Sequence, residues 1–334
     1  MKVNIESALN QTCPQKSKKI LTKMDVSILF STYNRPNSLK ETLDSFKELY
    51  LNNIAWEILV ADNADDPETQ NILRSFQKDL PVRFIVVTKP GKNAALNELV
   101  KIAKGELFVF TDDDVTPDPR WILELWEAFK RWPNDILFGG KVIPKFPPST
   151  PLWVKSPSFE YAFAAFAWFD KGEEERPFED CPFGPNMAVT ANVFKELGFM
   201  FDEHIGPCGN DYPMGSETSF CKKLKKVNQR YIYVPTSIVY HRIRPDQVTF
   251  KALLKRAYRH GRGLAISHPN HNCKELFGAP RYLYKKIAIL AFKYFLNYWR
   301  SPEKKWPYGK WLYFHLGMLK QYRILSKQDK KNAK

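Results

Sequence analysis

Short apolar runs alternate with amphipathic segments through the first third of the chain. Residues 26–30, 57–61, 82–87 and 107–110 are mostly apolar, which is typical of short buried strands. Between the first two runs, Leu39, Leu43 and Phe46 fall on one face of a helix. Strands that alternate with helices at this spacing predict an α/β fold, in which helices cover both faces of a mostly parallel sheet.

Local signals predict where several of these elements begin and end. Ser38 is followed three residues later by Glu41, a capping box that would start the first helix at that point. Pro67 would open the second helix, and Gly105 would close a third helix over residues 94–103. Further along, the same patterns predict helices at 121–131 and 250–266, an apolar stretch at 136–142, and short strands at 231–234 and 238–240.

Polar side chains follow three of the predicted strands. The turn 31–36 follows the first strand, Asp62 the second, and Asp112 to Asp114 the fourth. Ligands of open α/β sheets bind beyond the carboxyl ends of the strands, so these clusters should meet at one edge. Side chains alternate along an extended backbone, so Asp112 and Asp114 should point the same way and could share a hard divalent cation. A solvated acidic turn is the alternative.

Two common nucleotide sites are not favoured. The first strand is followed by Ser-Thr-Tyr-Asn-Arg-Pro rather than by the G-x-G-x-x-G of dinucleotide-binding folds. The sequence also contains no P-loop motif. A nucleotide would therefore have to be bound in another way.

Composition bounds the class of protein. The chain has 334 residues, of which 44% are apolar and 14% aromatic, enough for one large globular domain. No apolar run approaches the roughly 18 residues that would span a bilayer. The five cysteines are odd in number and form no C-x-x-C pair, so we expect neither a disulfide framework nor a zinc ribbon, and a reduced cytosolic protein.

Charge is distributed unevenly along the chain. The net charge is +15, but residues 221–334 hold 27 basic and 4 acidic side chains, which leaves 24 basic and 32 acidic in residues 1–220. The N-terminal two thirds therefore carries −8 and the C-terminal third +23. This asymmetry indicates an anionic partner for the C-terminal third, and phosphate, membrane and nucleic acid all fit.

Several motifs resemble those of inverting glycosyltransferases of family 2, which have the GT-A fold. Residues 26–36 are similar to the family's opening strand and turn, and residues 111–114 stand where the family has its D-x-D motif. The segments 91–97 and 183–188 are similar to its G-x-x-x-A-x-N and G-x-N-M motifs. The resemblance covers about residues 24–265, with Leu96 as a departure at a position where many members carry Arg.

The resemblance implies a reaction and a set of binding residues. Such enzymes move a sugar from a nucleotide diphosphate donor to an acceptor hydroxyl with the help of Mn²⁺ or Mg²⁺. The residues expected to contact the nucleotide-sugar are Thr32, Tyr33, Arg35, Asp62, Asn93, Asp112 and Asp113. Those expected to hold the metal are Asp112, Asp114 and His241, although a structural role for His241 stays open.

Glu217 is the candidate catalytic base. The segment 215–220 opens a predicted helix, and in the family a carboxylate at this position takes the acceptor proton. Chemistry also requires a base, because an acceptor hydroxyl has a high pKa. The alternative is that Glu217 only complements the positive end of its helix.

The resemblance and the charge pattern together suggest a domain organisation. We expect a leader over residues 1–23 and a catalytic domain over 24–265, with a nucleotide-sugar half at 24–120 and an acceptor half at 121–265. Residues 266–334 would form a basic helical tail, in which Lys286, Lys293 and Arg300 recur every seven residues. An apolar stripe runs beside them at Leu283, Ile287, Leu290, Tyr294 and Tyr298.

Three partners fit this tail. An amphipathic basic helix suits an anionic membrane surface, whereas packing on the catalytic domain and binding to nucleic acid are the alternatives. We favour the membrane, because glycan acceptors are often lipid-linked and no nucleic-acid fold signature is present. The predicted location is the cytoplasm, at the cytoplasmic face of the membrane.

Two other functions compete with this interpretation. A nucleotidyltransferase has a similar sheet but usually needs a Gly-rich basic loop after the first strand, which this sequence lacks. A non-catalytic membrane or glycan-binding scaffold would have no need for acids at all three positions. The sequence therefore predicts a transferase of the polysaccharide or glycoconjugate class, with a glycan or lipid-linked acceptor.

Overall fold

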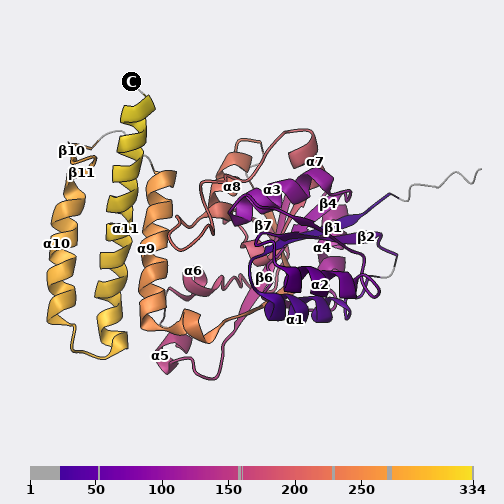
Figure 1. Cartoon of the computed structure of the whole chain (residues 1–334), viewed down its shortest axis with the longest axis horizontal. Helices are drawn as coiled ribbons and strands as arrows, with labels where there is room; N and C mark the ends of the chain where they lie inside the picture. The colour runs from indigo at the N-terminus through magenta and orange to yellow at the C-terminus, as the bar shows by residue number, and fades with distance from the viewer. Residues whose placement is uncertain are drawn as a thin grey trace, which may run out of the picture.

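The computed structural model of the chain describes residues 23–51, 53–156, 159, 161–227, 230–268 and 273–332 (Figure 1). Apart from Lys23, the predicted leader lies outside these residues. Within them, nine strands form one sheet in the order β3-β2-β1-β4-β8-β6-β9-β5, and β7 pairs with β9. The predicted α/β fold is confirmed.

The elements have the following bounds. The strands of the sheet are β1 (Val26–Thr32), β2 (Trp56–Asp62), β3 (Val82–Val86), β4 (Leu107–Phe110), β5 (Val115–Pro117), β6 (Leu137–Lys145), β7 (Arg176–Phe178), β8 (Met187–Thr190) and β9 (Tyr231–Arg242). A separate hairpin consists of β10 (Glu275–Leu276) and β11 (Ala279–Pro280). The α-helices are α1 (Pro36–Phe46), α2 (Pro67–Phe76), α3 (Lys92–Ile102), α4 (Trp121–Arg131), α5 (Leu152–Lys155), α6 (Ala162–Phe166), α7 (Ala191–Lys195), α8 (Ser216–Leu224), α9 (Phe250–Ser267), α10 (Arg281–Leu296) and α11 (Pro302–Asn332). Two 3₁₀ turns are η1 (Gly184–Asn186) and η2 (Pro245–Val248).

The sheet is parallel in its first half and mixed in its second. Strand β1 pairs in parallel with β2 and β4, and β2 pairs in parallel with β3. Strand β8 then lies antiparallel between β4 and β6. The long strand β9 runs parallel to β6 and antiparallel to β5. Because Val115 of β5 pairs with His241 of β9, the acids between β4 and β5 lie near the end of β9.

Alternate side chains of β1 enter two hydrophobic cores on opposite faces of the sheet. Ile28 and Phe30 belong to the core that α1 and α4 cover, together with Trp121. Leu29 points the other way, into the core that α3 and α8 cover, which includes Phe220. A strand buried on both faces reads as a continuous apolar run, which explains why the sequence pattern located β1.

The predicted capping box is wrong. Helix α1 begins at Pro36, two residues before Ser38, and no side chain caps its first turn. Ser38 instead donates from Oγ to the carbonyl of Asp113 at 2.8 Å, and Glu41 forms an ion pair with Arg242 at 3.2 Å. Ser38 therefore links α1 to the acidic turn after β4, and Glu41 links it to the end of β9. The two short strands predicted over 231–240 are likewise one strand, β9.

A disulfide overturns the expectation that the cysteines form no bridge. Cys181 and Cys221 are bonded, with Cα atoms 6.0 Å apart and 40 residues between them in sequence. The bond ties α8 to the segment that precedes η1. Cys208 and Cys273 are free and exposed.

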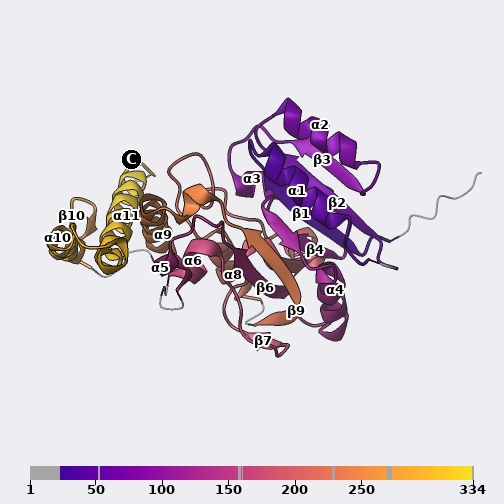
Figure 2. The same cartoon turned by 90° about the horizontal axis from the view of Figure 1, so that it is seen from below.

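The C-terminal third forms three long helices side by side. Helix α11 packs between α9 and α10, and α10 lies outermost (Figures 1 and 2). Helix α9 approaches α11 through glycines: a Cβ on Gly261 would lie 1.8 Å from the Phe314 carbonyl oxygen, and one on Gly317 would lie 2.0 Å from that of Tyr258. No helix in the described part of the chain combines the length and apolar character needed to cross a membrane.

Candidate active site

Asp113 is turned into the protein and organises the turn after β4. Its Oδ2 accepts a hydrogen bond from Thr32 at 2.7 Å, and its Oδ1 accepts one from Arg35 at 3.0 Å. Its backbone carbonyl accepts from Ser38 and from Thr42, each at 2.8 Å. Burial raises the pKa of Asp113 to about 6, although the neighbouring Arg35 opposes the shift. The Thr32 hydroxyl and the Asp113 carboxylate are thus hydrogen-bonded within the protein.

Asp114 lies on the other side of this turn, beside His241 at the end of β9. His241 Nε2 is 3.4 Å from Asp114 Oδ1, and Arg35 Nη1 is 3.2 Å from Asp114 Oδ2. Burial would raise the pKa of Asp114, but the hydrogen bond from His241 and the nearby guanidinium groups hold it well below its usual range. The site therefore keeps an ionised carboxylate at the end of β9.

The orientation of His241 is fixed by its second nitrogen. Nδ1 donates to the carbonyl of Phe166 at 3.0 Å, which leaves Nε2 to face Asp114. Ligating histidines are commonly held in this way through the nitrogen that does not bind the metal. Burial would lower the pKa of His241, but its hydrogen bond to Asp114 raises it.

Lys92, in the first turn of α3, lies near carboxylates from two segments, the turn after β4 and the first turn of α8. Its ammonium group pairs with Asp112. Burial would lower the pKa of Lys92, but the negative charges of Asp112, Glu217 and Asp114 raise it. Lys92 therefore joins α3 directly to the turn after β4 and lies within electrostatic range of Glu217 in α8.

Glu217 is held against the segment that contains η1. A Cβ on Gly184 would lie 2.4 Å from Glu217 Oε1, so the carboxylate lies directly against this glycine and a larger residue there would displace it. The preceding residue, Ser216, donates from Oγ to Asn93 Oδ1 at 2.6 Å. Together with the disulfide at Cys221, these contacts fix the first turn of α8 beside α3.

Asn93 and Asp62 are buried and shape the loops around the site. Asn93 donates from Nδ2 to the carbonyls of Asp202 and Ile205, at 2.7 and 2.8 Å. The Asp62 carboxylate accepts the backbone N–H groups of residues 64 and 66 and the side chain of Gln70. Tyr33 differs from both, because 60% of its surface is exposed at the end of β1.

The predicted metal ligands are only partly gathered. Asp114 and His241 are adjacent, whereas Asp112 is paired with Lys92. Among the residues that the structure describes, no three His, Cys, Asp or Glu side chains are arranged to hold a metal ion. The carboxylate and imidazole donors of Asp114 and His241 nevertheless suit Mn²⁺, and the fixed orientation of His241 fits a ligand.

Three basic residues of the site were not predicted. Lys92 follows Gly91 directly at the start of a helix, a signal that could have drawn attention to it. Arg242 donates from Nη2 to Thr42 Oγ1 and to the Ser38 carbonyl, both at 2.8 Å. Arg244 Nη1 lies 3.5 Å from Asp114 Oδ2. Residues 242 and 244 follow a predicted strand, so their presence near its end could be expected. Their contacts with α1 and with Asp114 could not be predicted, because they depend on the tertiary packing.

Comparison with known proteins decides the family. The family model described as glycosyl transferase family 2 matches residues 27–194, half of the chain. The chain belongs to glycosyl transferase family 2. It is an enzyme of the nucleotide-sugar transferase class, as the resemblance implied.

Individual relatives agree with this family. The transferase is 23% identical over 248 residues to the glucosyl-dolichyl phosphate glucuronosyltransferase of Haloferax volcanii, a match that covers 71% of this chain and 75% of the relative. It is 31% identical over 121 residues to the dolichol-phosphate mannosyltransferase of Pyrococcus furiosus, which covers 36% of this chain and 34% of the relative.

Two solved structures have the same fold. The mannosyltransferase PcManGT from Pyrobaculum calidifontis, in complex with GDP-Man and Mn²⁺, matches with a TM-score of 0.55 and 18% identity over 93% of this chain and 89% of that one. GalNAc-T7 with UDP, GalNAc and Mn²⁺ matches with a TM-score of 0.52 and 15% identity over 72% of this chain and 48% of that one.

Proposed function

We propose that the transferase moves a sugar from a nucleotide diphosphate donor to an acceptor hydroxyl, with inversion at the anomeric carbon, in the synthesis of a polysaccharide or glycoconjugate. The observation that carries the proposal is the convergence of Asp112, Asp114 and Glu217 around Lys92. A solvated acidic turn would not bring together carboxylates from β4 and α8. A passive scaffold would have no reason to bring them together.

Two of the predicted donor contacts remain available to a ligand. Tyr33 is exposed and Arg35 is partly exposed, so we propose that these side chains contact the nucleotide-sugar. Thr32, Asp62, Asn93 and Asp113 use their polar atoms within the protein, and their role would be to hold the loops in place. Arg35 could exchange its bonds to Asp113 and Asp114 for bonds to a diphosphate, because guanidinium groups bind both.

Asp114 and His241 are the proposed metal-binding residues. A Mn²⁺ ion held there would neutralise the diphosphate that leaves the sugar. Mn²⁺ is named because the structures of PcManGT and GalNAc-T7 contain it. Asp112 would join these ligands if Lys92 moved from it to a phosphate oxygen.

Glu217 is the proposed general base. The acceptor oxygen would form a bond to the anomeric carbon while the bond from that carbon to the diphosphate breaks, and Glu217 would take the hydroxyl proton. Lys92 lies within electrostatic range of Glu217, so the proposed base stands near a cation of the donor side of the site. Asp211, the nearest other candidate, is bound to Arg262 at 2.6 Å.

The proposal extends to domain organisation and location. Residues 24–120 would form the nucleotide-sugar half and 121–265 the acceptor half. Residues 266–334 would bind an anionic membrane at its cytoplasmic face, where a lipid-linked acceptor could be reached. The positive charge of this tail supports such a partner.

Thermal stabilisation by nucleotide-sugars tests the donor and the metal together. We expect at least one nucleotide-sugar of a panel to raise the melting temperature with Mn²⁺ and to lose most of this effect with a chelator, because a ligand of the native state stabilises it. Asp114→Ala should abolish the difference between the two conditions. Calorimetry of the same nucleotide-sugar should then show weaker binding that no longer depends on Mn²⁺.

Glu98→Ala is a matched control, since Glu98 lies in α3 and pairs with Lys101 away from the site. Metal-dependent binding that survives in Asp114→Ala would assign the acids to a solvated turn. A protein stabilised by glycans but by no nucleotide-sugar would favour the scaffold alternative.

A further inference from the structure

The outer face of α10 and the turn that follows it carry an exposed apolar row. Its members recur at steps of three and four residues and share one side of the helix. They are Tyr282, Ile289, Phe292, Leu296 and Trp299, with Lys285 in the same row. The exposed fraction is 63% for Phe292 and 90% for Trp299. Contiguous exposed apolar side chains of this size mark a binding surface rather than an ordinary helix face.

This row differs from the apolar stripe predicted from the sequence. The predicted stripe faces inward: Leu283 is buried and Ile287 is partly buried against Phe314 and Met318 of α11. Helix α10 is therefore apolar on two sides. Packing on α11 accounts for the inner side only, and the outer side is exposed in the part of the chain that the structure describes.

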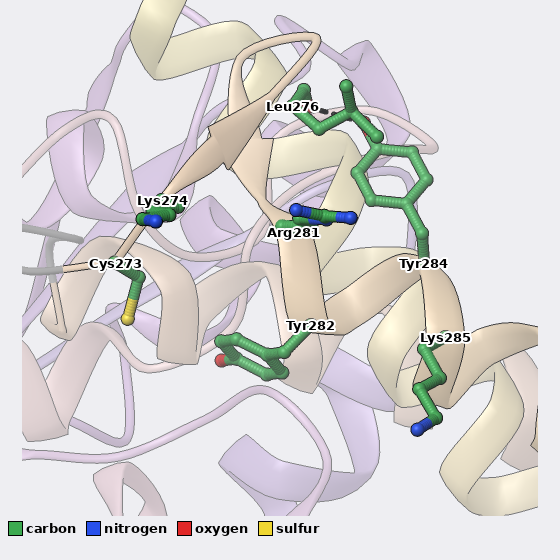
Figure 3. Close-up of a pocket in the computed structure, with 7 residues that line it drawn as sticks. All are labelled: Cys273, Lys274, Leu276, Arg281, Tyr282, Tyr284 and Lys285. Atoms are coloured by element: carbon green, nitrogen blue, oxygen red, sulfur yellow. Dashed lines mark hydrogen bonds between the residues drawn. The ribbon is translucent and has the colours of Figure 1, made fainter.

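Basic side chains accompany the outer row along its whole length. Residues 281–300 contain no Asp or Glu, and the exposed residues Lys286, Lys293 and Arg300 follow Lys285, Phe292 and Trp299 directly. A depression of about 630 Å³ opens at the N-terminal end of the same helix (Figure 3). Its lining includes Lys274, Arg281 and Lys285. Both ends of α10 thus present cations beside apolar groups.

Charge decides between the two partners that an apolar helix face could take. A second copy packed on this row would bring Lys286, Lys293 and Arg300 of one helix beside the same cations of the other, which is repulsive. An anionic bilayer offers phosphate oxygens to these cations and an acyl boundary to the aromatic row. Trp and Tyr are also the residues typical of this boundary.

We propose that α10 docks through its outer face, residues 282, 285, 289, 292, 296 and 299, onto a bilayer that contains anionic lipids. The helix lies in the plane of the interface, and its inner face stays on α11. This inference rests on the membrane association proposed above and specifies the surface that makes it. It does not depend on the transfer chemistry.

Vesicle flotation with the full chain tests the docking face. The protein should float with vesicles of equal parts phosphatidylglycerol and phosphatidylcholine, and less with phosphatidylcholine alone. The double variant Phe292→Ser/Trp299→Ser should lower the partition coefficient at least about tenfold, because two large apolar side chains no longer leave water. Leu152→Ser is the control, since Leu152 is 86% exposed on α5, outside the docking face.

A charge variant tests the lipid selectivity. Lys286→Glu/Lys293→Glu should lose about tenfold or more of the partition to anionic vesicles and little of that to neutral ones. Lys78→Glu, an exposed lysine of the catalytic domain, should leave both unchanged. Unchanged melting temperatures would show that these exposed substitutions leave the fold intact.

The outcomes separate the two levels of the inference. If the parent protein binds no anionic vesicles, the membrane association itself is overturned. If the parent binds and the docking-face variant binds equally well, only the assignment to α10 fails. A dimer in lipid-free solution that Phe292→Ser/Trp299→Ser dissociates would assign the face to a second copy and would also overturn the proposal. Stabilisation by the nucleotide-sugar, measured on the same samples, reports on the transferase independently.

Discussion

The Lys92 ammonium group shows how single residues set the electrostatics of this site. It pairs with Asp112, 20 positions away in the sequence. The negative charge of Glu217, 125 positions away, also raises the pKa of Lys92. Without this cation, the acids of the turn after β4 and of α8 would repel one another. Lys92 can therefore be regarded as the residue that allows the carboxylates to converge before a metal or donor binds.

Glu217→Gln is the decisive substitution at this scale. Glutamine keeps the size of the side chain but cannot take a proton, so we expect the transfer rate to fall by about 10² to 10⁴ and donor affinity to stay nearly unchanged. Rate, donor affinity and melting temperature should be measured on the same variant. The control is Asp211→Asn, because Asp211 is exposed and bound to Arg262.

The alternative role of Glu217 gives a different result. If it only complements the positive end of α8, the substitution should cost about 0.3 to 1 kcal/mol of folding free energy and leave turnover per folded molecule intact. A variant that folds, binds donor and transfers at the parent rate would remove Glu217 as the base.

The sequence identified site residues better than it identified their partners. Alternation along an extended backbone predicted that Asp112 and Asp114 point the same way, whereas residues 113 and 114 form a turn and Arg35 binds both Asp113 and Asp114. The sequence did not show that Thr32 would bind Asp113, 81 residues away, or that Asn93 would bind the backbone of residue 202, 109 residues away. Such pairs depend on strand order, which local patterns do not contain.

At the scale of elements, the close contact of α9 and α11 depends on glycine. A Cβ at position 317 would fall 2.0 Å from a backbone oxygen of α9, which cannot move without moving the helix. At Gly309, in the same helix, a Cβ would meet only the ends of the Leu254 and Tyr294 side chains, at 2.9 Å. The two glycines have the same helix propensity, but a Cβ would meet backbone atoms at position 317 and side-chain atoms at position 309.

Gly317→Ala should therefore destabilise the protein by about 1 to 3 kcal/mol through overpacking, although alanine is the better helix former by about 1 kcal/mol. Gly309→Ala should be neutral or stabilising, because flexible side-chain ends can move aside. Chemical denaturation of the two variants is the measurement. Equal stabilisation of both would mean that the helices separate easily.

The boundaries of a helix were predicted well where its apolar positions repeat over several turns. They were predicted less well where the prediction rested on a single capping pair. Helix α4 has the predicted bounds, 121–131, because its apolar positions repeat through three turns. The capping box at Ser38 and Glu41 failed, because both side chains found tertiary partners in the turn after β4 and in β9. A capping motif in the sequence does not form when its side chains bind residues that are distant in the sequence.

On the scale of the whole molecule, the disulfide is the feature that composition did not predict. An odd number of cysteines without C-x-x-C spacing gave no reason to pair Cys181 with Cys221, and only the fold brings them together. Unpaired cysteines therefore no longer support a reduced cytosolic location for this protein.

Reduction should lower the free energy of unfolding by about 2 to 4 kcal/mol, because the bond closes a loop of 40 residues in the unfolded chain. Denaturation with and without a reductant measures this difference. The variant Cys208→Ser/Cys273→Ser, which changes the two free exposed cysteines, should keep the full effect. Reaction of all five cysteines with a thiol reagent in the native protein would contradict the bond.

The overall architecture was predictable only in part. Alternating strands and helices predicted the four strands of the parallel half but not their order, β3-β2-β1-β4. Strand β8 lies between β4 and β6 and is antiparallel to both. No hydrophobic periodicity in the sequence predicts this arrangement. The charge asymmetry correctly drew attention to the C-terminal third, but only packing against α11 shows which side of α10 stays exposed.

The position of β9 limits how this enzyme can change in evolution. His241 and Arg242 are neighbours that point to opposite sides, the imidazole to Asp114 and the guanidinium to Thr42. Insertion or deletion of a single residue between Ile238 and His241 would exchange the two, because side chains along a strand alternate. A guanidinium would then stand where the proposed metal ligand belongs. Descendants of this chain can therefore change the length of β9 by one residue only before Ile238, where the bulge between Val234 and Ile238 already takes up extra residues.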